Sequence, residues 1–385
     1  MIERTLSTYV KDNAGWFPVV SVTGPRQSGK STLVQHVFPD YEYVNLEDEA
    51  TRSLALADPT GFIRERPSRL IIDEAQRVPE LFSAIQVASD ISGEPGQYVL
   101  SGSQNFLLLK QIGQSLAGRM GICKLLPLSY RECKDSGKDD TPDSFMLKGG
   151  YPRLHVADIP PQVFFENYLQ TYVMRDVAGY IDERSIKAFR TLVELCAQSC
   201  GSLLNVARLS NDVGVSRATI DSWLSILESS YILFRLQPYH ANIRKRLVKT
   251  PKLYFYDTGL LCYLLGISTA DQLRDSPARG SVFENLVIAE TLKRHTHAGR
   301  NPELYFYRDD SKVEVDLIDI TDRSARELVE IKSSTSFEPG FARHLESVGD
   351  ALDIPRQGRS VVMRSDASHV VNDIKFWSAH DWLMR

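Results

Sequence analysis

Apolar and polar positions alternate along the chain in three successive patterns. In the first part, short apolar runs alternate with helix-like segments, which is typical of a parallel sheet with crossover helices. These strand-like runs cover residues 19–23, 41–46, 70–73, 97–101 and 121–126. The polar stretch 134–144 predicts a surface loop, and residues 164–199 then follow a helical period. Strand-like patterns return at 231–236, 252–256, 312–318 and 327–332.

Composition limits the class of protein. A chain of 385 residues with 43% hydrophobic and 24% charged residues is long enough for two or three globular domains. Forty-five basic against 49 acidic residues give a net charge of −4, so any nucleic-acid surface must be a local patch. No apolar run approaches the roughly 20 residues needed to cross a bilayer, and no leader is recognisable, so we expect a cytoplasmic protein without membrane contact. The five cysteines form no Cys-x-x-Cys pair, which favours buried thiols over a zinc site.

The most specific motif lies directly after the first strand-like run. Gly24, four further residues, and then Gly29-Lys30-Ser31 have the spacing of a phosphate-binding loop. Glycines let the backbone N–H groups point at phosphate oxygens, Lys30 reaches the β- and γ-phosphates, and Ser31 offers its hydroxyl to Mg²⁺. The residues predicted to bind ATP here are Gly24, Pro25, Arg26, Gln27, Ser28, Gly29, Lys30, Ser31 and Thr32. The plainer alternative is a glycine turn with a chance lysine.

Two acids follow the strand-like run at 70–73. Parallel strands deliver their carboxyl ends to one sheet edge, so Asp73 is predicted to hold the magnesium ion through water. Glu74 is predicted to orient and deprotonate the attacking water, because phosphoryl transfer depends on a positioned nucleophile. The alternative is a strand that simply ends in solvated acids.

Two further positions bear on hydrolysis. The run 97–101 continues into Ser103, our first choice for a side chain that contacts the γ-phosphate or the water, with Gln104 second. Arg119 precedes the last strand-like run, at the sheet edge far from the loop, where it can reach a neighbouring subunit's nucleotide more easily than its own. Order, spacing and this arginine resemble the AAA+ ATPases, which implies a homo-oligomer with Arg119 acting in trans. A surface arginine that caps a turn is the alternative.

The middle of the chain predicts a winged helix-turn-helix. Residues 205–224 give a short helix, a glycine turn and a second helix capped by Ser216, and the strands at 231–236 and 252–256 form the wing. On the outer face of the second helix lie Arg217, Thr219 and Ser222, the predicted DNA contacts. The connection 242–252 adds five basic and no acidic residues, which suit a phosphate backbone: Arg244, Lys245, Arg246, Lys249 and Lys252. A protein-docking module, or a solvated basic loop, is the alternative.

The pattern of the last third predicts a second metal site. Glu284 opens a helix-like run, Asp316 lies in an alternating strand, and Glu330 and Lys332 form Glu-x-Lys in the next strand. If these two strands pair as a hairpin, the acids come together as ligands for Mg²⁺, and the lysine steadies water or phosphate. This constellation resembles the PD-(D/E)xK nuclease superfamily. An exposed hairpin with alternating charges is the alternative.

Taken together, the three parts resemble a large prokaryotic family of AAA+ ATPases with a nuclease-like carboxy-terminal domain. The resemblance also rests on Gly149-Gly150-Tyr151-Pro152 and implies ATP binding by Gly29, Lys30, Ser31 and Asp73. The predicted fold is α/β, with a P-loop core, a helical lid, a winged helix and a small α/β nuclease-like domain. Their predicted limits are 1–135, 145–200, 201–270 and 278–385.

The function predicted from the sequence is a magnesium-dependent ATPase that couples ATP hydrolysis to DNA binding or remodelling. In the alternative, the chain is an ATP-controlled switch whose winged helix and terminal domain bind proteins and have no nuclease activity. Stimulation of ATP hydrolysis by DNA distinguishes the two.

Overall fold

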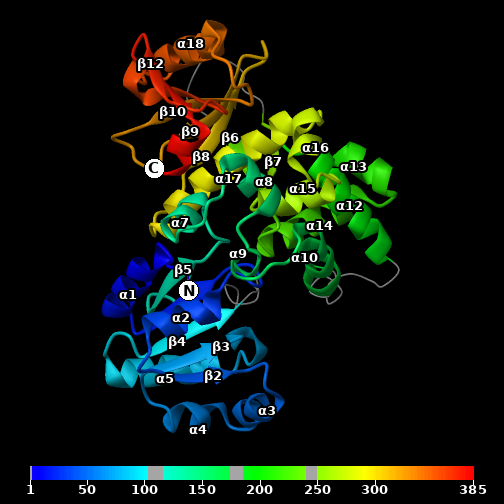
Figure 1. Ribbon diagram of the computed structural model, residues 1–385. Coiled ribbons are helices and arrows are strands. Elements are labelled where there is room, and N and C mark those ends of the chain that lie inside the picture. Colours follow the sequence, from blue (N-terminus) through cyan, green and yellow to red (C-terminus); the bar gives the residue numbers. More distant parts are fainter. Residues whose placement is uncertain (1, 103–115, 174–184, 240–248) are drawn as a thin grey trace. The chain divides into compact units, whose positions relative to one another are not determined.

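The computed structural model describes residues 2–102, 116–173, 185–239 and 249–385, and Figure 1 shows their helices and strands. Contacts divide the chain into two compact units. The first contains the residues up to Pro127 together with Ser229–Tyr231 and Thr296–Gly299, and the second contains the others. The finer division into four domains stays a prediction.

A parallel sheet of five strands forms the centre of the first unit. Its strands are β1 (Val19–Thr23), β2 (Glu42–Asn45), β3 (Leu70–Asp73), β4 (Tyr98–Gly102) and β5 (Met120–Lys124). They lie in the order β2-β3-β4-β1-β5, and every neighbouring pair is parallel. The predicted sheet is therefore confirmed, with strand ends shifted by one or two residues at most.

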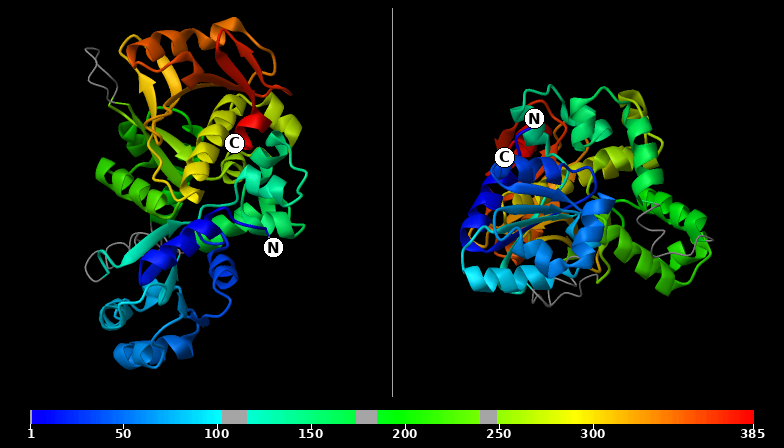
Figure 2. Two further views of the ribbon diagram at one scale, coloured as in Figure 1. Left: turned by 90° about the vertical axis from the view of Figure 1, so that its left-hand side faces the viewer. Right: turned by 90° about the horizontal axis from the view of Figure 1, so that it is seen from below.

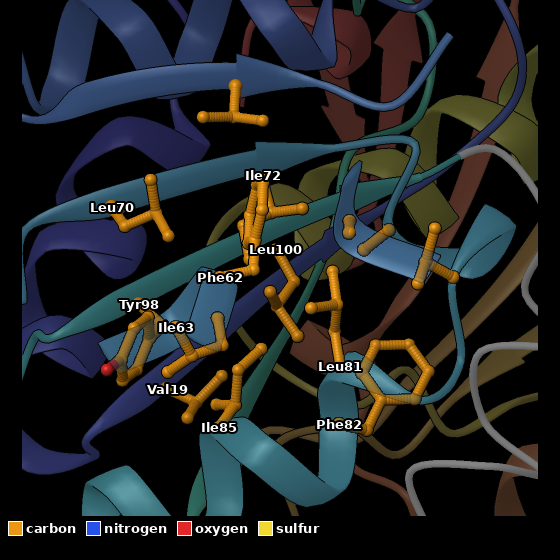
Figure 3. Packing of buried hydrophobic residues seen from close by; sticks show 14 of the residues in the cluster. Val19, Phe62, Ile63, Leu70, Ile72, Leu81, Phe82, Ile85, Tyr98 and Leu100 are labelled. Atoms are coloured by element: carbon orange, nitrogen blue, oxygen red, sulfur yellow. The ribbon is translucent and has the colours of Figure 1, made fainter. Parts of the chain in front are cut away.

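Helices cover both faces of this sheet. They are α1 (Leu6–Trp16), α2 (Lys30–Val37), α3 (Glu49–Ala57), α4 (Pro59–Arg64), the short 3₁₀ turn η1 (Ala75–Arg77) and α5 (Leu81–Ser92). Alternate strand residues pack to opposite sides, as buried parallel strands require. Figure 3 shows one side, where Ile72 and Leu100 of the strands meet Phe62 of α4 and Ile85 of α5. On the other side, Val20 and Val22 pack with residues of α1 and α2. This packing fixes the carboxyl ends of the strands along one edge.

The second unit begins with helices. These are α7 (Tyr130–Asp135), α8 (Pro142–Lys148), α9 (Pro152–Val156), α10 (Pro161–Tyr168), the π-turn η2 (Leu169–Val173), α12 (Ile186–Gln198), α13 (Val206–Val213), α14 (Arg217–Ser229), α15 (Thr258–Leu264) and α16 (Ala270–Asp275). The loop predicted at 134–144 is shorter than expected. Capping boxes at Ser129 and Thr141 start helices on either side of it, so only the stretch between α7 and α8 is irregular.

Asp257 explains the glycine pair at 149–150 in structural terms. Its carboxylate accepts hydrogen bonds from the backbone N–H of Gly150 at 2.7 Å and of Leu260 at 3.0 Å, where it caps α15. A side chain on Gly149 would place its Cβ 2.2 Å from that carboxylate. The motif therefore joins two helical segments of the second unit.

The second unit also contains an eight-stranded mixed sheet. Its strands are β6 (Leu233–Pro238), β7 (Lys252–Phe255), β8 (Leu304–Arg308), β9 (Glu314–Asp319), β10 (Glu327–Lys332), β11 (Arg359–Met363), β12 (His369–Val371) and β13 (Ile374–Ser378). Their order is β12-β13-β11-β10-β9-β8-β6-β7. The β9–β10 hairpin forms as predicted. The expected wing strands β6 and β7 also form a hairpin, but β6 in addition pairs in parallel with β8, so they belong to the terminal sheet.

Two helices flank the middle of this sheet. The remaining helical elements are α17 (Arg279–His297), η4 (Pro339–Ala342), α18 (Arg343–Ala351), η5 (Arg356–Gly358) and α19 (Ala379–Leu383). Figures 1 and 2 show α18 on one side of β9–β11 and α17 on the other. Leu345 and Val348 of α18 pack on Val315 and Leu328 of the sheet, and His295 of α17 bonds Asp319 of β9 at 2.6 Å. This arrangement brings Glu284 on α17 next to β9.

Candidate functional site

The loop between β1 and α2 has the backbone of a phosphate-binding turn. Gly24 and Gly29 have φ values of 154° and 93°, and a Cβ on Gly24 would lie 2.0 Å from the backbone oxygen of Leu125. Lys30, the first residue of α2, is buried and donates to the backbone oxygens of Gly24 at 3.1 Å and Pro25 at 2.8 Å. The lysine ammonium therefore lies inside the curl of the loop.

Asp73 is the centre of a hydrogen-bond network at the same sheet edge. Ser31 donates its hydroxyl to Asp73 Oδ2 at 2.6 Å, as expected if both hold one magnesium ion. Tyr43 of β2 donates to the same oxygen at 2.7 Å, and Ser101 of β4 donates to Asp73 Oδ1 at 2.5 Å. With a residue exposure of only 4%, the Asp73 carboxylate is oriented from three neighbouring elements.

Sequence reasoning missed Tyr43 and Ser101. Ser101 lies directly opposite Asp73 in the β3–β4 register, so the parallel pairing of these strands was a usable signal. Ser103, the predicted residue, and Gln104 lie outside the described residues.

Glu74 directly follows Asp73 in a left-handed backbone conformation with φ of 54°, which is unusual for a non-glycine residue. Burial raises the pKa of this carboxyl, while Lys30 and Arg26 of the loop act to lower it. Gln76 donates a hydrogen bond to Glu74 Oε2. A half-buried carboxyl of raised pKa beside the phosphate loop has the character of a general base.

Arg4 supports the loop from a distance in sequence. Its guanidinium is buried and donates to the backbone oxygens of Ser28 at 2.8 Å and Leu126 at 2.7 Å. It thus ties the phosphate loop to the chain just past β5. No local pattern marks an arginine 24 residues upstream as part of this site.

Arg119 lies at the amino-terminal start of β5, at the sheet edge opposite the phosphate loop. Its guanidinium forms two hydrogen bonds to Asp90 of α5, at 2.5 and 3.0 Å. An arginine that acts on a second subunit must first give up this ion pair. Its role in trans, and the oligomer that the role requires, stay predictions.

The helix-turn-helix pattern is present in α13 and α14. Gly214 turns the chain with φ of 79°, and the Ser216 hydroxyl accepts from the backbone N–H of Thr219 at 3.1 Å. Arg217 and Ser222 are exposed, whereas Thr219 is half-buried. On the shared inner face of the two helices, five apolar residues are buried: Leu209, Ile220, Trp223, Leu224 and Leu227.

The basic connection is only partly described. Arg244, Lys245 and Arg246 lie outside the described residues, and Lys249 is exposed. Lys252 corrects the sequence interpretation: its side chain is 3% exposed and ion-paired, so it is not available to a phosphate backbone.

The four residues predicted for the terminal site come together in one cluster. Asp316 Oδ2 accepts from the backbone N–H of Ile331 at 2.8 Å, and Lys332 Nζ lies 2.5 Å from Glu330 Oε1. On the other side of Asp316, Glu284 of α17 accepts from the Tyr254 hydroxyl and from Lys252 Nζ.

Three carboxyls in this cluster hold their protons more tightly than usual. Burial and the neighbouring Asp316 raise the pKa of Glu284 to about 7 and that of Glu330 to about 8. Burial also raises the pKa of Asp316 itself. Within the described ranges, no group of three or more acidic, histidine or cysteine side chains is arranged to hold a metal ion. The predicted magnesium site of Glu284, Asp316 and Glu330 is thus not formed by the residues as they lie.

No helix in the described part of the chain is long and apolar enough to cross a membrane.

Three family models match successive parts of the chain. Residues 17–134 match an AAA domain, residues 140–271 a domain of unknown function (DUF8612), and residues 279–382 a second domain of unknown function (DUF4143). These matches follow the order of the P-loop sheet, the helical middle and the terminal sheet.

Solved structures show partial likeness. A Walker-type ATPase of Pyrococcus abyssi has a TM-score of 0.46 and 15% identity, over 69% of this chain and 96% of that chain. AMPPCP-bound DnaA from Aquifex aeolicus has a TM-score of 0.31 and 13% identity, over 58% of this chain and 85% of that chain.

Two relatives share more of the sequence. Proteins of Mycobacterium bovis and Mycobacterium tuberculosis, each described as uncharacterized, are 31% identical over 346 residues, which is 88% of this chain and 75% of each relative. The chain therefore belongs to the family of these mycobacterial proteins, and its first part is a P-loop ATPase domain of the AAA type.

Proposed function

We propose that the chain hydrolyses ATP at the β1–α2 loop in a magnesium-dependent reaction. The observation that carries this proposal is the 2.6 Å contact between the Ser31 hydroxyl and Asp73 Oδ2. It joins the two oxygen ligands that a P-loop enzyme uses for Mg²⁺, so the residues present fit the ion. When bound with ATP, Mg²⁺ neutralises charge on the transferred phosphoryl group.

The chain's own residues supply the remaining functions. Lys30 exchanges its contacts with the oxygens of Gly24 and Pro25 for phosphate oxygens, which costs little because it already lies in the loop. Glu74 accepts the proton of the attacking water. Its raised pKa brings the carboxyl closer to the operating pH, and Lys30 and Arg26 limit the rise.

Two substitutions separate binding from hydrolysis. Lys30→Ala removes the ammonium that would contact the β- and γ-phosphates. It is therefore expected to abolish both ATP binding and hydrolysis. Glu74→Gln is expected to keep binding while the rate falls by about 10²–10⁴, the usual contribution of a general base. The control is Glu80→Gln, an exposed carboxyl six residues further on. Hydrolysis by Glu74→Gln at the wild-type rate would remove Glu74 from the mechanism.

As a second candidate, we infer that ATP hydrolysis is coupled to DNA. The supporting observation is the capped α13–α14 pair, which exposes Arg217 and Ser222 on the helix that would enter a groove. Lys249 and the basic residues before it would add contacts to the phosphate backbone. Against this, Arg208 of α13 is paired with Asp212, and Lys252 is buried, which weakens the positive patch.

The coupling has a direct test. ATP hydrolysis is measured with forked, single-stranded and duplex DNA, and stimulation supports the coupled function. Replacing Arg244, Lys245 and Arg246 by Ala is expected to reduce the log-log salt dependence of DNA binding by about 2 to 3. The exposed Arg323→Ala serves as a charge control. An unchanged slope with no stimulation favours the alternative, an ATP-controlled switch whose helix pair binds protein.

A further inference from the structure

Lys252 lies among carboxylates that come from two other elements. This lysine is the first residue of β7, and its Nζ is 2.6 Å from Glu314 Oε1 and 4.0 Å from Asp316 Oδ1, both on β9. It is also 3.1 Å from Glu284 Oε1 on α17. With 3% of its side chain exposed, the ammonium is effectively removed from water.

The ammonium is held there as a cation. Burial works to lower the pKa of Lys252, but Glu284, Asp316 and Glu314 outweigh it and raise that pKa above its ordinary value. A buried charge is tolerated only when it is paired and hydrogen-bonded, and Lys252 has close carboxylate oxygens on two sides. The acids therefore already share a positive charge that belongs to the chain.

A divalent ion would need the same oxygens. Mg²⁺ requires near-octahedral oxygen ligands at about 2.0–2.1 Å, and it cannot share these carboxylates closely with an ammonium. The other oxygens are also engaged, since Asp316 Oδ2 accepts from Ile331 and Glu330 Oε1 accepts from Lys332. Glu330 Oε2 is buried with no hydrogen-bond partner among the described residues, but a single oxygen does not make a metal site.

We propose that Lys252 is a built-in cation that takes the place of a divalent metal in the cluster of Glu284, Glu314 and Asp316. The cluster then joins α17, β7 and β9 by ion pairs, and the full chain cleaves no DNA through a metal at this position. This proposal does not depend on ATP hydrolysis in the first unit.

The test uses the nucleotide-free full chain with Asp73→Asn, which removes the carboxylate of the other magnesium site. Mn²⁺ binding is followed by calorimetry, and the melting temperature is followed with Mg²⁺ or Mn²⁺. With Lys252 present, we expect neither binding nor a thermal shift. Two variants, Lys252→Met and Lys252→Ala, remove the ammonium from between the acids. Lys252→Met keeps much of the side-chain volume.

Both variants are expected to gain one Mn²⁺ site. At a hundredfold excess over Kd the melting temperature should rise by roughly 5 °C or more. A further Asp316→Asn substitution should remove the gain. Lys249→Ala, an exposed lysine three residues away, is the matched control and should gain nothing.

Two results would overturn the proposal. The first is Mn²⁺ binding in the chain that keeps Lys252, if Asp316→Asn abolishes it. The second is a folded Lys252 variant that binds no metal. If both Lys252 variants fail to fold, the Mn²⁺ titration of the chain that keeps Lys252 still tests the proposal. No Mn²⁺ binding to that chain supports the proposal. Mn²⁺ binding that Asp316→Asn abolishes refutes it.

Discussion

Glu330 gives the second unit a pH-dependent stability that one substitution can isolate. Its carboxyl is buried in β10, faces Asp316 and Glu314 of β9, and pairs with Lys332. Burial and Asp316 raise its pKa from the ordinary 4.5 to about 8, although Lys332 acts in the opposite direction. At pH 6, the folded protein therefore holds a proton on Glu330 that the unfolded chain has lost.

The sign and size of the effect follow from proton linkage. Between the unfolded and folded pKa values, unfolding releases this proton, so the free energy of unfolding falls as pH rises. Each pH unit is worth about 1.4 kcal/mol for one group. Glu330→Gln imitates the protonated form at every pH and removes this dependence. From an unfolded pKa of 4.5, the variant should exceed the wild type by about 1.4 kcal/mol at pH 5.5 and by about 4 kcal/mol at pH 7.5. The difference in the free energy of unfolding therefore widens by about 2.5 kcal/mol over this range.

Urea denaturation from pH 5.5 to 7.5 measures the difference. Three of the four tryptophans, Trp223, Trp377 and Trp382, lie in the second unit, so fluorescence in a Trp16→Phe background reports its unfolding. The raised pKa of Glu284 contributes the same slope to both proteins and cancels in the comparison. Glu338→Gln, an exposed carboxyl, is the control. Parallel pH curves for wild type and Glu330→Gln would refute the buried, protonated state.

Three further predictions concern the ATPase unit. Arg4→Ala removes the donors that hold the phosphate loop and should weaken ATP binding by about tenfold, or ~1.4 kcal/mol, with Arg4→Lys intermediate in a nucleotide titration. Ser101→Ala removes a hydrogen-bond donor to Asp73, so the Mg²⁺ concentration that gives half-maximal hydrolysis should rise by roughly 10- to 100-fold. An unchanged concentration would show that Ser101 serves only in packing. Mixing Arg119→Ala with Lys30→Ala subunits should restore part of the hydrolysis if Arg119 acts in trans, whereas a fully active monomer would exclude that role.

Much of the fold could be predicted from the sequence because strand patterns and helix caps depend on neighbouring residues. Buried parallel strands require continuous apolar runs, so β1 and β3 are predicted at their observed limits. Helix starts follow from capping chemistry, as at Ser216, and missed capping boxes explain the overlong loop at 134–144. Strand pattern alone could not reveal that the hairpin after α14 joins the terminal sheet, because the β6–β8 pairing is set by contacts between distant segments.

The sequence by itself determined the phosphate loop, because Gly24, Gly29 and Lys30 carry their chemistry within one turn of the backbone. The tertiary structure alone decided which distant groups reach the sites. Arg4 crosses to the loop, and Ser101 turns to Asp73. Lys252 shows the physical reason most clearly: within its own stretch it belongs to a basic loop, but burial against acids that lie more than thirty residues later makes it an internal cation. Pairing and desolvation depend on distance in space, which the order of residues does not record.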